Sequence, residues 1–193
     1  IISIFKKNKF ITFFGVFYIF LYLGIGVVQE NRAEKLGKLI ANMRGHESKR
    51  LTVKPSLGNL FLWKSIYEDN GFYYVDAVRL LLKPEYCQGT KIKKLDTSNN
   101  FMGLNQNSQQ YKDIERFNWF SQGYLGVGTQ KNIITDVRYS AVPNEVDGLW
   151  GIQINPSKKN SEHVDWVVNR TSYKAKWKRF LDLLFGKGCK GII

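Results

Sequence analysis

The chain has 193 residues, enough for one domain of ordinary size that buries its own core. Hydrophobic residues make up 44% of the sequence and aromatic residues 15%, which argues against a disordered protein. Lys and Arg number 29 against 16 Asp and Glu, and the formal charge of +13 favours an anionic partner such as phospholipid, nucleic acid or a phosphorylated substrate. Lipid ranks first because the chain also carries an apolar segment of membrane length.

That apolar segment is an uncharged run from Phe10 to Gln29, FITFFGVFYIFLYLGIGVVQ. At about 1.5 Å per residue it reaches across a hydrocarbon core of about 30 Å, so it predicts a transmembrane helix over residues 10–29. A signal peptide is disfavoured because it would be shorter and followed by a small-residue cleavage site. A buried soluble helix is the alternative. Basic residues flank both ends of the run, so the orientation stays open.

The next segment, QENRAEKLGKLIANMRG, continues with helix-forming residues. Leu36, Ile40 and Met43 fall at helical spacing, which predicts a short amphipathic extension along the membrane surface that ends at Gly45. Residues 1–45 are therefore expected to form a membrane helix with its connector. Residues 46–193 are expected to form a water-facing α+β domain. Because the first residue is an isoleucine and not methionine, we expect the numbering to start inside a longer chain.

A β-hairpin is the clearest local prediction in the water-facing part. In FLWKSIYEDNGFYYVDAVRLL, two alternating, β-rich runs flank Asn70-Gly71, the favoured centre of a type I′ turn. Counting outward from the turn gives a register with three pairs on one face: Tyr67 with Tyr74, Ser65 with Asp76, and Trp63 with Val78. The other face is apolar as well, so we expect cover on both sides.

Further elements follow the hairpin. Residues 89–112 are rich in Asn, Gln and Ser and predict a long surface excursion. A short helix is expected at DIERFNWFSQGY, followed by strands at NIITDVRYSAV, GLWGIQI and HVDWVVNR. With the hairpin, these strands predict one antiparallel sheet of about five strands. Four tryptophans spread over these elements are expected in the core, with a membrane interface as the alternative: Trp63, Trp119, Trp150 and Trp166.

The tail SYKAKWKRFLDLLFGKG predicts a C-terminal amphipathic helix with Thr171 as its cap and Gly186 as its stop. Its apolar stripe is Tyr173, Trp177, Phe180, Leu181 and Leu184. Its other face is basic and carries Lys174, Lys178 and Arg179. We expect the helix to pack on the sheet with its charges in water; the alternative is contact with an anionic membrane.

Neither the cysteines nor the histidines form a recognisable site. Cys87 and Cys189 are far apart and lack Cys-x-x-Cys spacing, so two unpaired thiols are favoured over a bridge. His46 and His163 are also isolated, and we expect both at the surface, with no metal or other cofactor in this part of the protein.

Catalytic and cofactor motifs such as GxSxG, HExxH, the P-loop and GxGxxG do not occur in the sequence. Candidate site residues come from polar strand faces. Asp136, Arg138 and Ser140 alternate onto one face of a predicted strand, where they could bind a polar ligand or form an ion pair within the sheet. Two further candidates have the same two interpretations. They are Asp76, which is near Arg79, and Arg116, which is beside Glu115.

Several blocks occur in order between about Val53 and Trp166: VKPSLGNLFLWKSIYEDNGFYYVDAVRLL, ERFNWFSQGYL and ITDVRYSAVPNEVDGLWGIQI. Together they resemble the C-terminal part of the bacterial inner-membrane metal-dependent hydrolase family (YdjM-like, described as LexA-regulated). The resemblance implies a multi-spanning membrane protein whose N-terminal half holds a divalent metal through a histidine-containing motif. That motif is absent from this sequence, so none of its residues is assigned as a metal ligand.

Two functions follow as hypotheses. The first is a C-terminal accessory domain of a membrane-bound hydrolase in the bacterial inner membrane, which meets the metal-binding half of its own chain and helps to present an anionic or lipid substrate. The alternative is a non-enzymatic membrane-surface module that binds anionic lipid or a partner protein. Nucleic acid ranks third because the basic residues are dispersed and follow no recognised motif.

Overall fold

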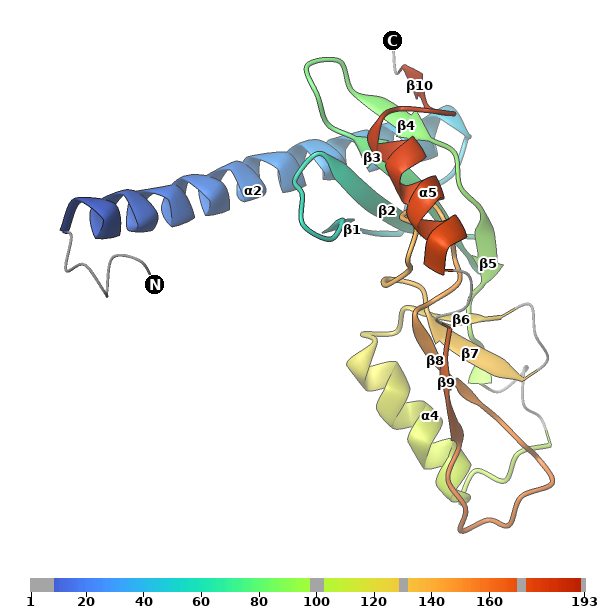
Figure 1. Ribbon diagram of the computed structural model, residues 1–193. Coiled ribbons are helices and arrows are strands. Elements are labelled where there is room, and N and C mark those ends of the chain that lie inside the picture. The colour runs from blue at the N-terminus through green and yellow to red at the C-terminus, as the bar shows by residue number, and fades with distance from the viewer. Residues whose placement is uncertain (1–8, 98–102, 129–131, 170–172, 192–193) are drawn as a thin grey trace.

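The computed structural model describes residues 9–97, 103–128, 132–169 and 173–191. One long helix, α2 (Lys9–Met43), projects from a body of two antiparallel sheets (Figure 1). A C-terminal helix, α5 (Tyr173–Leu184), packs on that body. The α+β class, the long apolar N-terminal helix and the C-terminal helix are thus confirmed. The proposed helix cap, Thr171, lies outside the described residues.

The sheet that contains the hairpin, called here the large sheet, has the strand order β1-β2-β3-β4-β10, and β5 also pairs with β3. The edge of β3 is shared: β4 pairs with its C-terminal half and β5 with its N-terminal half. The strands are β1 (Arg50–Pro55), β2 (Leu62–Asp69), β3 (Phe72–Arg79), β4 (Glu85–Cys87), β5 (Lys91–Lys93) and β10 (Lys190–Gly191).

The second sheet, called the small sheet, runs in chain order: β6 (Leu125–Val127), β7 (Ile133–Asp136), β8 (Trp150–Gln153) and β9 (Asp165–Val168). The predicted antiparallel strands are thus confirmed, but they form two sheets of six and four strands where one sheet of about five was expected. Strands occur in the predicted segments, but the strands after residue 120 pair with one another and not with the hairpin. A bridge between Lys94 and Gly126 links the two sheets. The described residues of the polar stretch 89–112 include β5 and the start of α4, where only a surface excursion was expected.

The hairpin of β2 and β3 has the predicted register, with Tyr67 opposite Tyr74 and Ser65 opposite Asp76. Asn70 and Gly71 have φ values of 46° and 76°. Both values lie in the left-handed region that a type I′ turn requires. The dipeptide and the alternation of the flanking runs therefore fixed this part of the fold.

Different elements cover the two faces of the hairpin. On one face, Trp63 and Val78 pack against residues 33–40 of α2. On the other face, Leu62 and Ala77 meet α5, and the residues nearer the turn meet the small sheet. The predicted cover on both sides is confirmed.

The second half of α2 differs from the expected surface connector. Its buried residues are Gln29, Ala33, Leu36, Gly37, Ile40 and Ala41. A Cβ on Gly37 would lie 2.5 Å from Ser65 Oγ, so the helix approaches β2 closely only because this residue is glycine. This half of α2 is an integral layer of the domain, and the helix continues without a break between the two halves. The chain turns away near Gly45, as predicted.

Helix α4 (Gln109–Phe120) covers the small sheet, and Ile114 and Phe117 pack against strand residues such as Ile134. The helix was predicted, although it begins four residues earlier than its expected first residue, Asp113. Ser108 caps it by accepting a hydrogen bond from the backbone N–H of Tyr111.

The expectation of two unpaired thiols is wrong, because Cys87 and Cys189 form a disulfide. They are 102 residues apart in sequence, and the pairing of β10 with β4 brings them together. The expectation of core tryptophans holds for Trp63, which is 2% exposed, and fails for Trp119 and Trp166, which are 75% and 70% exposed. Trp150 is partly exposed. These three belong to the small sheet and its helix, whose outer surfaces carry little cover.

Candidate functional site

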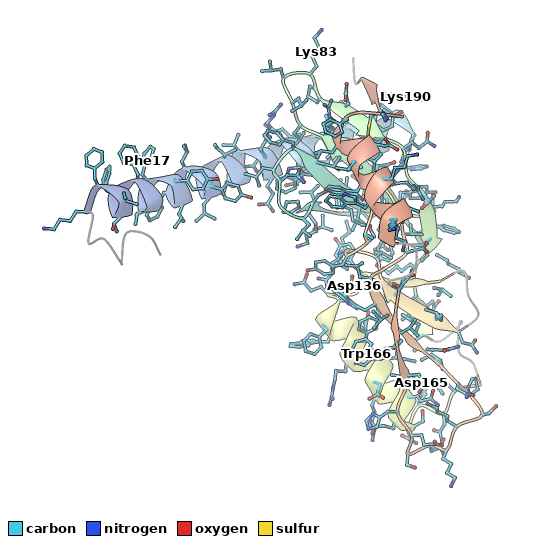
Figure 2. The ribbon with its side chains drawn as sticks, viewed as in Figure 1. Phe17, Lys83, Asp136, Asp165, Trp166 and Lys190 are labelled. Atoms are coloured by element: carbon cyan, nitrogen blue, oxygen red, sulfur yellow. A yellow bond between two sulfur atoms is a disulfide. The ribbon has the colours of Figure 1, made fainter. Side chains whose placement is uncertain are left out.

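Four of the five predicted polar residues fall into two clusters on opposite sides of the large sheet. Asp76 points toward α2, on the face that carries Trp63 and Val78. Asp136, Arg138 and Ser140 lie where the small sheet meets the large one, and Figure 2 shows Asp136 at this junction. The structure therefore brings three of the five candidates near one another and separates Asp76 from them. Arg116 is exposed on α4.

In the cluster beneath α2, Asp76 is 1% exposed and accepts two hydrogen bonds from Arg44, at 2.7 and 2.8 Å. The backbone N–H of Gly89 donates a third, at 2.9 Å. Asp76 was predicted with Arg79, but Arg79 instead pairs with Glu85. The contact with Asp76 raises the pKa of Arg44 above its ordinary value. This pair fixes the end of α2 to the centre of the large sheet.

Aromatic rings extend the same cluster. Arg44 Nη1 donates to the Tyr67 hydroxyl at 3.1 Å, and His46 Nδ1 lies 2.8 Å from the same oxygen. The rings of Tyr67 and Tyr74 stack, and the His46 ring packs on Tyr74 with centroids 4.4 Å apart. Burial raises the pKa of Tyr67, which keeps its hydroxyl protonated. His46 is therefore half-buried, against expectation, whereas His163 is exposed.

At the junction of the sheets, Asp136 and Arg138 form a buried ion pair, with Nη2 to Oδ2 at 2.7 Å. Arg138 also donates to the Phe120 carbonyl at the end of α4 and to Gln122 Oε1. A cation there complements the negative end of a helix dipole. The bond to Asp136 raises the pKa of Arg138. Of the two interpretations, the geometry favours the ion pair, which also ties α4 to β7. The strand is shorter than predicted, because β7 ends at Asp136, so Arg138 pairs with it from the following turn.

Ser140 meets a residue that sequence reasoning missed. Lys64 on β2 is 4% exposed, and its Nζ donates to Ser140 Oγ at 2.7 Å and to the Glu145 carbonyl at 2.6 Å. Burial lowers the pKa of Lys64 to about 7, although nearby carboxylates oppose the shift. The sequence does contain a signal that this lysine is buried. Lys64 lies between Leu62 and Ile66 on one face of an alternating strand, and both of these neighbours are apolar.

The Lys64–Ser140 pair has the donor and acceptor types of a base and a nucleophile. However, the Ser140 hydroxyl donates its own hydrogen to the Val142 carbonyl at 2.6 Å. Lys64 joins β2 to the segment that connects β7 and β8, across the junction of the two sheets. The contacts of this pair are those of a cross-link that fixes the small sheet on the large one.

The donor atoms of the described residues do not form a metal site. Within the described ranges, no three His, Cys, Asp or Glu residues converge on one point as ligands. Both cysteines are bonded to each other, and the carboxylates at the centres of the two clusters are engaged by arginines. No reaction step through a metal is therefore derived from these residues.

The largest chemically distinct surface is apolar. The first half of α2 exposes large hydrophobic side chains on all sides, including Phe13, Phe17 and Phe20 (Phe17 is labelled in Figure 2). None of the apolar 18-residue window is buried against the protein. In length and composition this is a helix that can cross a membrane.

Comparison with known proteins adds no relative: no family model, curated protein or solved structure matches the chain.

Proposed function

We propose that the chain is a membrane-anchored accessory domain of a membrane-embedded hydrolase, in which the first half of α2 crosses the bilayer. One observation carries the anchoring. The apolar residues 10–28 are exposed, whereas residues 29–41 of the same unbroken helix are built into the large sheet. A helix that is apolar on every side needs a nonpolar surrounding, and the lipid core supplies it.

The accessory role rests on the resemblance described above and on the rigid attachment of α2. Arg44 and Asp76 lock the end of α2 to the large sheet, so the domain cannot swing freely below its anchor. A domain held in this way stays beside whatever the membrane helix contacts. The excess of positive charge supports an anionic substrate at the membrane surface.

The disulfide supports one orientation of the anchor. Disulfides persist in oxidising compartments and are rare in the cytosol. With Cys87 and Cys189 paired, the domain is proposed to lie on the outer side of a bacterial inner membrane. A membrane-impermeant maleimide should label the domain in intact cells only after a reducing agent is added. Labelling in lysed cells without a reducing agent would contradict a stable disulfide. Labelling that occurs only after the cells are lysed would place the domain on the cytoplasmic side of the membrane.

Two measurements test the main proposal. Alkaline extraction should leave the chain in the membrane pellet, and a variant with Ile19 and Leu23 both changed to Glu should appear in the supernatant. Elemental analysis should then detect a divalent metal in the complete gene product and none in the 193-residue chain. Stoichiometric metal in the chain, or hydrolysis by the chain alone, would overturn the accessory role.

A second candidate is a non-enzymatic lipid-binding module, favoured by the basic face of α5. Lys174, Lys178 and Arg179 are exposed on this helix. Arg179 also pairs with Glu145, so the face is partly neutralised. Residues 46–193 sedimenting with anionic vesicles at low salt, but not with neutral ones, would support this function. Loss of that binding on changing all three residues to Gln would assign it to α5.

A further inference from the structure

We propose that two loops beside α2, residues 56–61 and residues 80–84, insert their leucine side chains into the interface of the membrane that α2 crosses. The inference rests on the proposed anchoring and adds a second contact between the domain and the bilayer. Three features support it: the position of the loops along α2, their exposed side chains and the charges around them.

Hydrogen bonds fix both loops at one level of α2. The Gln29 side-chain amide donates to the carbonyl of Leu60 in one loop and to the carbonyl of Leu80 in the other, each at 3.1 Å. Arg32 Nη2 donates to the Leu81 carbonyl at 2.7 Å. The backbone N–H of Leu80 also donates to the Phe61 carbonyl, which joins the two loops directly. In the view of Figure 1, the β3–β4 connection lies above α2 and the β1–β2 connection below it.

That level coincides with the edge of the apolar segment. Residues 10–28 span about 28 Å at about 1.5 Å per residue, close to the thickness of a hydrocarbon core of about 30 Å. If these residues cross the bilayer, Gln29 lies at the boundary between hydrocarbon and head groups. The two loops must then lie at the same boundary, because they are bonded to Gln29.

The side chains of the loops are apolar and uncovered. Leu82 is 100% exposed and Leu57 is 93% exposed, and both lie at loop tips away from the core. Phe61 and Leu81 add partly exposed apolar surface. Single exposed leucines are common on soluble proteins, but here they occur in both loops that flank a membrane-length helix. Burial of such side chains at a bilayer boundary removes them from water.

Charges around the loops suit phospholipid head groups. Lys83 follows Leu82 directly and is exposed, and Figure 2 shows it at the outer end of its loop. Arg32 lies one helical turn beyond Gln29. A shallow groove on α2 is lined by apolar residues and ends at Gln29 and Arg32, with an apolar floor and a cationic end that match an acyl chain and an anionic head group. The occupant of this surface is therefore the lipid bilayer.

The test uses four variants of the full chain that each gain one cysteine, which is labelled with an environment-sensitive fluorophore: L57C and L82C in the loops, I19C at the middle of the apolar segment, and M43C as control. The native cysteines are bonded to each other and do not react without a reductant. Met43 is a matched control, since it is 61% exposed on the same helix and lies about 21 Å beyond Gln29. The labelled chains are placed in phosphatidylcholine vesicles with a minority of phosphatidylglycerol and a quencher on the lipid acyl chains.

We expect strong quenching at position 19, severalfold stronger quenching at 57 and 82 than at 43, and a blue-shifted emission at both loop positions. Quenching at 19 with no more at 57 and 82 than at 43 would overturn the loop inference and leave the anchoring intact. No quenching at 19 would overturn the anchoring itself. A blue shift at the loops without quenching would indicate that protein and not lipid covers them, and would also overturn the inference.

Discussion

The two sheets differ in how they are covered. In β2, at the centre of the large sheet, seven of eight residues are buried, whereas β9 at the edge of the small sheet has no fully buried residue. Helix α2 lies on one face of the large sheet, and α5 with the small sheet lies on the other. The small sheet has α4 on one face and exposed tryptophans on its strands. The comparison shows that the sheet that holds α2 is also the most enclosed part of the molecule.

Each sheet has its own buried arginine–aspartate pair at a helix end. Arg44 and Asp76 attach the end of α2 to the large sheet, and Arg138 and Asp136 attach the end of α4 to the small one. A buried pair is costly to break, because the remaining charge stays without a partner in a poorly solvated site. The two pairs therefore allow the stabilities of the two sheets to be tested separately.

The largest expected effect comes from the disulfide, which fastens β4 of the large sheet to the C-terminal segment. Replacing both Cys87 and Cys189 by Ala should lower the free energy of unfolding by about 4–5 kcal/mol, because a loop of about 100 residues is no longer closed in the unfolded chain. Urea unfolding in detergent, followed by tryptophan fluorescence, measures this change. Wild-type protein in reductant is the control and should behave like the variant. An unchanged midpoint would show that the bond contributes nothing to stability.

Removing one partner of each buried pair should separate the two sheets. Asp76→Asn and Asp136→Asn are each expected to cost about 3 kcal/mol. Hydrogen exchange should show faster exchange in residues 29–43 of α2 for the first variant, and in α4 and β6–β9 for the second. Glu34→Gln is the control, because its pair with Lys38 is exposed and should contribute less than about 1 kcal/mol. Equal loss of protection throughout the protein would show that the sheets unfold as one unit.

The third prediction concerns pH and the residue that joins the sheets. The pKa of Lys64 is about 7 in the folded protein, against 10.5 for an ordinary lysine. Between these values the unfolded chain binds a proton that the folded chain does not, so stability rises with pH. Relative to Lys64→Met, the wild-type protein should gain about 2 kcal/mol between pH 7 and pH 9. Parallel unfolding curves measured for both proteins at each pH provide the check, and a constant difference would contradict it.

The smallest effect is expected at the exposed tryptophans. Trp166→Ala should change stability by less than about 1 kcal/mol, because the ring has an edge contact with Phe117 but is otherwise in water. Trp63→Ala, in the large sheet, should cost about 3–5 kcal/mol. Thermal unfolding of the two variants measures both losses of stability, so they can be compared directly. Similar losses at both sites would mean that the small sheet is as enclosed as the large one.

The comparison also explains what could be predicted from the sequence. The hairpin was predicted to the residue, because Asn70-Gly71 and strict alternation are local signals. The disulfide and the Arg44–Asp76 pair depend on residues that are distant in sequence and meet only through topology. The division into two sheets was missed for the same reason. Among the candidate residues, Asp136 and Arg138 were found together because they are two residues apart in sequence, although β7 ends at Asp136 and Arg138 lies in the turn that follows. Lys64 was missed.

The unbroken course of α2 has a mechanical consequence. The helix is fastened at two levels, by Gln29 to the loops and by Arg44 to Asp76, which are 15 residues or about 22 Å apart along its axis. A helix that is fixed to the domain at two separated points cannot rotate relative to the domain about either point. Membrane helices tilt to match the thickness of the surrounding lipid. With the proposed anchoring, a change in bilayer thickness would therefore rotate the entire water-facing body, and the angle between that body and the membrane would report the thickness of the surrounding lipid.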